Sequence, residues 1–326
     1  MQDLNLKKRI ILVVQFIITI LLLIYLFQRF ELSFSKQSLN FLNPLWLIFP
    51  VYFAVIFIPI LAASRWRILL FFVGINANIY KLMKINFVSI FWGTFLPSGD
   101  GFAVIRMYQI EKKFPASPGQ ASSSIILEKL FGFMHLCLFG FVFSFFINDF
   151  PQITVFRLIL LGFLLILLIV LALLIKTNLI NSFQFLLKKF DRGSKISDYF
   201  RNLQDCLKNI PILKAILASS PLILLIQTIS FLNVYLIFKT LDLDVPIIFI
   251  LASMPIIQII SLIPVTLSGF GLREGAFIYF FSHIGIPVEI AFSVSIINFA
   301  VLTGLPATIG GFLSLNGQLR RRENLR

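Results

Sequence analysis

Long apolar runs, separated by short polar stretches, make up most of this chain. A run of about 20 residues is long enough to cross the hydrocarbon core of a bilayer. The pattern predicts six membrane-spanning helices, near 9–28, 45–63, 119–147, 153–175, 219–238 and 289–314. The first run follows basic residues, but Gln28-Arg29-Phe30-Glu31 after it is no small-residue cleavage site, so we expect an uncleaved helix rather than a signal peptide.

Two further apolar regions, 80–114 and 246–284, are each interrupted by Pro, Ser and Gly. A longer apolar arm precedes each break, and a shorter arm of about 13 residues, marginal for a crossing, follows it. The breaks are Leu96-Pro97-Ser98-Gly99-Asp100-Gly101 and Ile263-Pro264-Val265-Thr266-Leu267-Ser268-Gly269-Phe270-Gly271. Matching Gly/Pro interruptions in the two halves of a membrane protein point to a transport site.

Lysine and arginine gather in alternate connections between the apolar runs. Basic residues precede the first span, follow the first broken region, and recur in 65–84, 176–214 and 320–322. The positive-inside rule predicts that these stretches, Arg65 and Arg67 among them, and both termini are cytoplasmic. The first broken region should then enter and leave the membrane on the cytoplasmic side, and the second on the opposite side.

This arrangement predicts an inverted-topology repeat. One half covers about 9–147 and the other about 153–314, and each contains a span, a second span, a broken region and a last span. The motif prolines, Pro97 and Pro264, are 167 residues apart, and Ala121 and Ala291 are 170 apart. We therefore predict an all-α polytopic membrane protein, one transmembrane domain over 1–326, with about six full spans and two re-entrant helical hairpins. The alternative is eight to ten full spans.

The stretch 176–214 is the one sizeable polar segment. Its apolar residues at 183–190 alternate with lysines, and Phe200, Leu203, Leu207 and Ile210 recur at helical spacing. The pattern suggests a basic amphipathic helix at the cytoplasmic interface and a second amphipathic helix after it. The segment is either a plain connector or a docking site for anionic lipid headgroups.

Composition supports the membrane assignment. The chain is 59% hydrophobic and 13% charged, with a mean hydropathy of +0.96, whereas soluble domains are roughly 45–50% apolar and about 25% charged. The net charge of +14 lies beside apolar spans, so we expect loop bias and contacts with anionic headgroups rather than nucleic-acid binding. Cys137 and Cys206 have no pairing or metal spacing. No cofactor or metal is expected.

The hairpin tips carry the candidate chemistry. A tip such as Ser98-Gly99-Asp100-Gly101 leaves amide N–H groups free at the start of the next helix, where phosphate binds well. Arg106 and Arg273 follow the two tips at equivalent places, and a guanidinium can bind phosphate oxygens bidentately. We expect a phosphate cradle near the midplane, with the tip residues Ser98, Gly99, Gly101, Ser268, Gly269 and Gly271 among its contacts.

Carboxylates accompany these arginines. Asp100, Glu128 and Glu274 could orient the cations or carry a coupling proton, with His135 one helix face along from Glu128. The alternative is that the charges form structural ion pairs and that His135 is a packed, hydrogen-bonded residue.

The motifs resemble those of the lysylphosphatidylglycerol synthase transmembrane-region family. The resemblance rests on Leu96-Pro97-x-Gly99-x-Gly101 with Arg106, on Leu127-Glu128-Lys129, and on Ser268-Gly269-Phe270-Gly271-Leu272-Arg273-Glu274-Gly275. It implies passage of a lipid between leaflets. We expect a stand-alone member without the synthase domain that fused members carry. Lys129 and Asn298 stand where the family commonly has Arg, and we count both among the substrate-binding residues.

No Walker loop, HExxH motif or GxSxG elbow occurs in the sequence. We therefore expect a transporter without an ATPase motif rather than an enzyme: a flippase for an anionic phospholipid, an aminoacyl-phospholipid or a polyprenyl-phosphate-linked lipid. The alternatives are an embedded transferase acting on a lipid-linked substrate and a non-transporting accessory subunit. We expect a prokaryotic plasma (inner) membrane, and, as partners besides the lipid, a second copy of the chain or a lipid-synthesis enzyme.

Overall fold

A computed structural model confirms the all-α polytopic fold. It describes residues 44–94, 101–114, 118–147, 150, 152–176, 202–263, 265–266 and 269–323, with a few single residues between 17 and 28. Every regular element among these residues is helical.

Five helical stretches in the described part of the chain are long and apolar enough to cross a membrane. They match five of the predicted spans, and the other prediction, 9–28, lies largely outside the described residues. Two stretches contain a short π-helical segment, η1 or η3. The stretches consist of α3 (Pro44–Tyr52), η1 (Phe53–Phe57) and α4 (Ile58–Phe72); α7 (Pro118–Ser144); α8 (Ile153–Lys176); α11 (Ile212–Thr240); and α14 (Val288–Phe299), η3 (Ala300–Gly304) and α15 (Leu305–Glu323).

The two broken regions form helical hairpins. The first hairpin consists of α5 (Ile79–Thr94) and α6 (Gly101–Lys113), and the second of α12 (Ile247–Ser261) and α13 (Leu272–Ser282). Their arms have 16, 13, 15 and 11 residues. At about 1.5 Å per residue these arms are shorter than the roughly 30 Å hydrocarbon core. The arms of each hairpin pack against each other.

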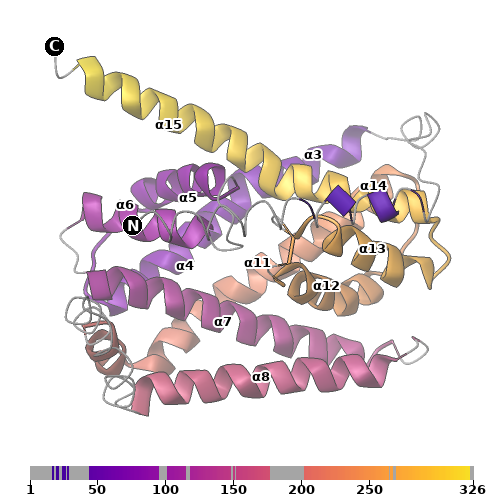
Figure 1. The fold of residues 1–326 in the computed structure, drawn as a ribbon, viewed down its shortest axis with the longest axis horizontal. Helices are drawn as coiled ribbons and strands as arrows, with labels where there is room; N and C mark the ends of the chain where they lie inside the picture. Colours follow the sequence, from indigo (N-terminus) through magenta and orange to yellow (C-terminus); the bar gives the residue numbers. More distant parts are fainter. Residues whose placement is uncertain are drawn as a thin grey trace.

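The hairpins enter from opposite ends of α7. At the start of α7, the Gln120 side-chain amide donates to the Val73 carbonyl (2.9 Å), just before α5, and α6 leads directly into α7. Just beyond the other end of α7, Phe150 stacks on Phe280 of α13 (centroids 5.1 Å) and contacts Phe249 of α12 (5.8 Å). Each hairpin therefore starts and finishes at one end of α7 (Figure 1). The assignment of one end to the cytoplasm stays a prediction.

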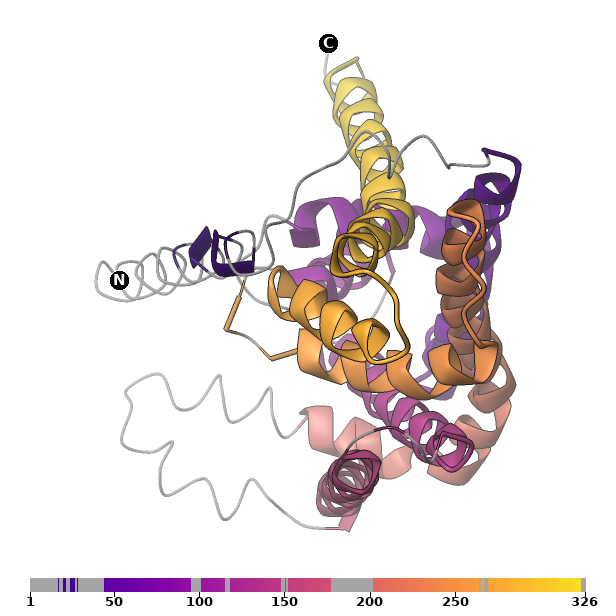
Figure 2. The same ribbon diagram turned by 90° about the vertical axis from the view of Figure 1, so that its right-hand side faces the viewer.

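The last span of each half packs on the hairpin of the other half. Helix α7 lies against α12, and α15 lies against α5, while α4 and α11 pack together (Figure 2). Glycines make both crossings close. A Cβ at Gly140 would lie 2.7 Å from the Pro255 Cβ, and a Cβ at Gly310 would collide with the Phe87 carbonyl oxygen. These glycines are 170 residues apart, the same offset that separates Ala121 from Ala291.

Two apolar cores surround the hairpins. Trp66, Leu82 and Phe131 belong to the core beside the first hairpin, and Phe238 and Phe281 to the core beside the second. Helix α7 is central: 56% of its apolar window is buried, against 11% for α8. Helix α8 therefore presents most of its surface to the surroundings.

Part of the polar stretch 176–214 is packed onto the membrane domain. Residues 202–209 are helical, and Leu203 and Leu207 are 7% and 1% exposed. The Ser123 hydroxyl at the start of α7 lies 3.3 Å from the Leu203 carbonyl oxygen. The second predicted helix is present here with its apolar residues turned inward, while 177–201, including the first, lie outside the described residues.

We predict that Gly310→Ala destabilises the chain by about 1–3 kcal/mol, because the added methyl group would collide with backbone of α5. Gly162→Ala in α8 is the matched control, since nothing lies within 4 Å of its Cβ position. Thermal unfolding of both variants in detergent measures the difference, and equal melting temperatures would contradict the close crossing.

Candidate functional site

The turn of the second hairpin depends on two glycines with left-handed backbone. Gly269 has φ +75° and Gly271 has φ +87°, and residues with a Cβ rarely adopt such positive φ values. A Cβ at Gly269 would lie 2.7 Å from the Ser261 carbonyl oxygen, so the turn closes tightly on the end of α12. Helix α13 begins directly after Gly271, whose N–H donates to Glu274 Oε2 (2.5 Å). The Glu274 carboxylate therefore accepts a hydrogen bond from a free N–H group at the start of α13.

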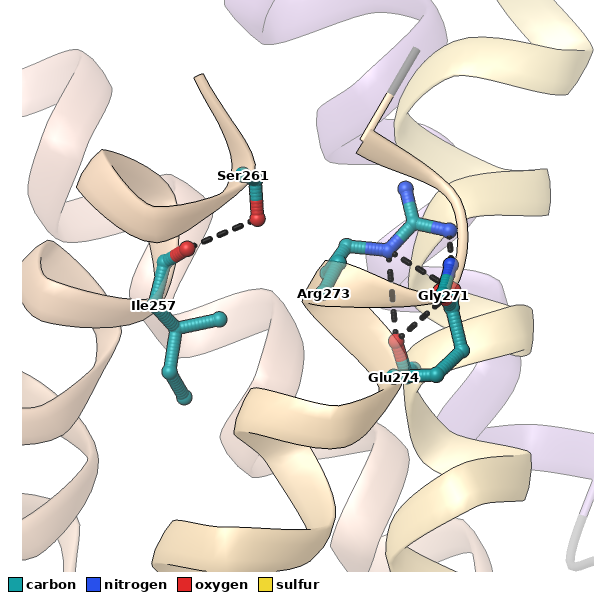
Figure 3. Close-up of polar contacts among 6 residues, drawn as sticks. Ile257, Ser261, Gly271, Arg273 and Glu274 are labelled. Atoms are coloured by element: carbon teal, nitrogen blue, oxygen red, sulfur yellow. Dashed lines mark hydrogen bonds and ion pairs between the residues drawn. The ribbon is translucent and has the colours of Figure 1, made fainter. Parts of the chain in front are cut away.

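Arg273 lies in the first turn of α13 and is fixed along one edge of its guanidinium. Its Nη2 and Nε donate to Glu274 Oε1 (2.5 and 3.1 Å), and Nε also lies 3.2 Å from Ser295 Oγ on α14. The rings of Phe270 and Phe299 flank it, with centroids 5.1 and 4.5 Å from Cζ. Figure 3 shows the other terminal nitrogen pointing away from Glu274. That nitrogen makes no hydrogen bond to a described residue and is available to a ligand.

Arg106 occupies the equivalent place in the first hairpin but is more deeply buried, at 3% exposure. Its Nη2 lies 2.6 Å from Glu128 Oε2 on α7, and Arg65 on α4 forms an ion pair with the other oxygen of the same carboxylate. The Trp66 ring covers the guanidinium at 3.6 Å, and the Phe102 ring lies at 4.9 Å. Two arginines therefore share one buried carboxylate.

A cavity of about 490 Å³ is lined by described residues of both hairpins. Its walls come from the end of α5, the start of α6, the end of α12 with its turn, and the start of α13, together with α7, α14 and η3. The residues that matter for its chemistry are Thr94, Phe102, Phe133, Gln258, Thr266, Gly269, Arg273, Asn298, Phe299 and Thr303. Residues of the second break line this hollow, whereas 95–100 of the first break lie outside the described residues, so the convergence of both breaks stays a prediction.

Two residues of the cavity lining carry buried polar atoms without partners. Thr266 Oγ1 and Asn298 Oδ1 make no hydrogen bond among the described residues. Buried polar atoms are rarely left unpaired in native proteins, and an unpaired atom calls for a water, an ion or a ligand. Together with the free nitrogen of Arg273, they give the cavity a polar lining suited to a headgroup.

The structure brings some of the predicted site residues together and separates others. Gly269, Arg273 and Asn298 line the cavity, Gly271 and Glu274 support Arg273 from behind, and Gly101 is the buried first residue of α6. Arg106, Glu128, Lys129 and His135 are not among the described lining residues. Ser98, Gly99, Asp100 and Ser268 lie outside the described residues.

His135 lies apart from Glu128. Its Nδ1 is 2.7 Å from the Phe131 carbonyl oxygen and its Nε2 is 2.8 Å from Ser220 Oγ on α11. Both ring nitrogens therefore have partners, one within α7 and one on α11, as expected for a packed, hydrogen-bonded histidine.

Arg65 is the main correction to the sequence analysis. Counting charges placed it in a cytoplasmic connection, but α4 continues to Phe72 and holds Arg65 against the buried carboxylate of Glu128. Trp66, Phe102 and Phe299 were also missed. Phe102 and Phe299 are two of 39 phenylalanines in a lipid-compatible chain, so neither composition nor periodicity distinguishes them.

Comparison with protein families gives one match, which covers most of the chain. The model of the family described as "Lysylphosphatidylglycerol synthase TM region" matches residues 12–310. Comparison with curated proteins finds no significant match, and neither does comparison with solved structures. In the described residues, no group of three or more His, Cys, Asp or Glu side chains could hold a metal ion.

We predict that Glu128→Gln destabilises the chain by about 3–5 kcal/mol, because it leaves the buried guanidinium of Arg106 and the partly buried guanidinium of Arg65 without a counter-charge. Arg106→Gln should cost much less, since Arg65 and Glu128 remain a balanced pair. Thermal unfolding in detergent compares the two variants, and a larger loss for Arg106→Gln would contradict the shared-carboxylate arrangement.

Proposed function

The chain belongs to the lysylphosphatidylglycerol synthase TM region family, and from this membership and the cavity lined by both hairpins we propose that it is a lipid translocase. Its substrate would be an anionic phospholipid, an aminoacyl-phospholipid or a polyprenyl-phosphate-linked lipid, moved between the leaflets of a prokaryotic plasma membrane.

The observation that carries the proposal is Arg273 on the wall of the cavity. Glu274 holds one edge of its guanidinium and leaves a terminal nitrogen for a phosphate oxygen. Charge-assisted hydrogen bonds of this kind are roughly twice as strong as neutral ones. Asn298 and Thr266 offer amide and hydroxyl groups to the rest of the headgroup.

The rim of the cavity suits the apolar part of a lipid. Leu262 and Ile263 line the cavity at the end of α12, and their exposed fractions are 41% and 47%. A volume of about 490 Å³ is within the range of about 300–1,000 Å³ usual for small-molecule sites. We therefore place the headgroup inside and the acyl chains over this rim, in the surrounding lipid.

Alternating access would come from rocking of the two halves around the cavity. The hairpins enter from opposite ends of α7, so on this proposal the first hairpin would close the cavity toward one face and the second toward the other. Each hairpin is tied to the last span of the other half by a glycine crossing. Movement of one half would therefore shift both hairpins, and with them both sides of the cavity, together.

A transporter fits the described carboxylates better than a transferase does. A transferase would need a carboxylate base that faces the substrate. Glu128 is held between two arginines, and Glu274 is fully buried and bonded to Arg273 and to the Gly271 N–H. Neither has a free oxygen toward the cavity. We further propose a second copy of the chain or a lipid-synthesis enzyme as the protein partner.

We predict that Arg273→Gln lowers the translocation rate by about 10- to 100-fold, the loss expected for one charged hydrogen-bonding contact. The measurement is dithionite quenching of a fluorescent phosphatidylglycerol in proteoliposomes that contain the full chain. Arg67→Gln is the matched control, because Arg67 is exposed near the end of α4 and does not line the cavity.

Three results would count against the proposal. Unchanged transfer by the Arg106→Ala and Arg273→Ala double variant would remove the proposed phosphate contacts. Chemical turnover of the headgroup by the purified chain would favour the embedded transferase, and tolerance of apolar replacements throughout the hairpin tips would favour the accessory subunit.

A further inference from the structure

We infer that Phe102 separates the open cavity from a second anion subsite, formed by Arg65 and Arg106. The identity of the ligand, a phosphate group of a lipid, rests on the proposed function. The existence of the subsite rests on geometry and charge alone.

The barrier between cavity and subsite is one aromatic ring. Phe102 lines the cavity, and the centroid of its ring lies 4.9 Å from Cζ of Arg106. Trp66 covers Arg106 at 3.6 Å. The guanidinium is therefore held between two rings, and one of those rings is also part of the cavity wall.

The cluster behind this ring carries surplus positive charge. Within the described residues, Arg65 and Arg106 contribute two positive charges and Glu128 one negative charge. By contrast, Arg273 and Glu274 on the other side of the cavity are balanced. A surplus charge buried at membrane depth is costly, so it attracts an anion that can reach it.

The cluster also has unused donors. The Nε atoms of Arg65 and Arg106 are buried and have no hydrogen-bond partner among the described residues. Arg106 as a whole is 3% exposed. Unpaired N–H groups on a cluster with one surplus positive charge fit the oxygens of a phosphodiester, whose single negative charge equals that surplus.

Gly93 fixes the backbone that carries this ring. A Cβ at Gly93 would lie 2.6 Å from the Phe102 nitrogen and 2.7 Å from its Cα, so the two arms of the first hairpin touch at this point. With the backbone held, rotation of the Phe102 side chain is the movement that opens the subsite. An anion released by Arg273 would then meet Arg106, which gives the transport path two anion subsites in series.

The test is the electrostatic potential at the wall. Phe102→Cys is made in the full chain with Cys137→Ser and Cys206→Ser, and the protein is placed in phosphatidylcholine nanodiscs. Modification rates are compared for an anionic and a cationic methanethiosulfonate, each normalised to a free thiol. The surplus charge should favour the anionic reagent by about tenfold or more. Adding Arg106→Gln leaves a balanced Arg65–Glu128 pair and should abolish the preference.

Three results would overturn the inference. They are equal rates for the two reagents at position 102, a preference that persists in the Arg106→Gln variant, and an equal preference at Thr303→Cys on the opposite wall of the cavity. A second measurement applies if the cysteine variant misfolds. Phe102→Ala should change the rate of phosphatidylglycerol transfer at least about threefold more than Phe133→Ala does. Phe133→Ala is the control, because it removes another ring from the cavity lining. Equal effects would again overturn the inference.

The source of the anion is tested by protection of the thiol in the Phe102→Cys variant. Slower modification in phosphatidylglycerol nanodiscs but not in millimolar inorganic phosphate assigns the subsite to a lipid headgroup. Protection by phosphate as well assigns it to a free anion, and protection by neither overturns it as a binding site. If position 102 reacts faster with the anionic reagent but the chain moves no lipid, the anion subsite is supported and the proposed translocase function is rejected.

Discussion

A guanidinium buried inside a membrane protein must be neutralised and hydrogen-bonded by the chain around it, and both hairpins are organised around this requirement. An arginine at the centre of a membrane helix costs about 2.5–3.5 kcal/mol on insertion scales. Arg106 meets the requirement with Glu128 and two aromatic rings, and Arg273 with Glu274, Ser295 and two aromatic rings. The hairpin breaks, the glycine turn and the cavity are all arranged near these two side chains.

The halves meet this requirement differently, and the difference affects how each hairpin can move. Arg106 is tied to α7 through Glu128 and, by the shared carboxylate, to α4 through Arg65. Movement of the first hairpin against those helices breaks an ion pair. Arg273 bonds to the adjacent residue of its own helix. The second hairpin can therefore shift as a unit with its ion pair intact, although it loses the contacts of that pair with Ser295 and Phe299 on α14.

Much of the fold could be predicted from sequence because the relevant signals are local. Apolar run length located the spans, the Pro/Gly clusters located both hairpin turns, and loop charge indicated that each hairpin returns to the side it left. The Arg273–Glu274 pair is also local, since Glu274 stands three residues after Gly271 at a helix start, the position of a capping carboxylate.

The contacts around Arg106 could not be predicted from local sequence signals. Arg65 and Glu128 are 63 residues apart, and a charge near the end of an apolar run fits a cytoplasmic loop as well as a buried ion pair. Which of two equivalent arginines faces a cavity depends on how its neighbours pack. Only the folded chain shows that Phe102 covers Arg106 while Arg273 remains accessible.

The glycine crossings explain how two unlike hairpins can serve one cavity. Gly140 brings α7 close to α12, and Gly310 brings α15 close to α5, so the last span of each half carries the hairpin of the other. Interiors at such crossings are close-packed and transmit displacement instead of absorbing it. A shift of α7 that loosens Glu128 from Arg106 must therefore also displace α12, whose end lines the cavity. Release of the first arginine and rearrangement of the cavity around the second are in this way parts of one movement.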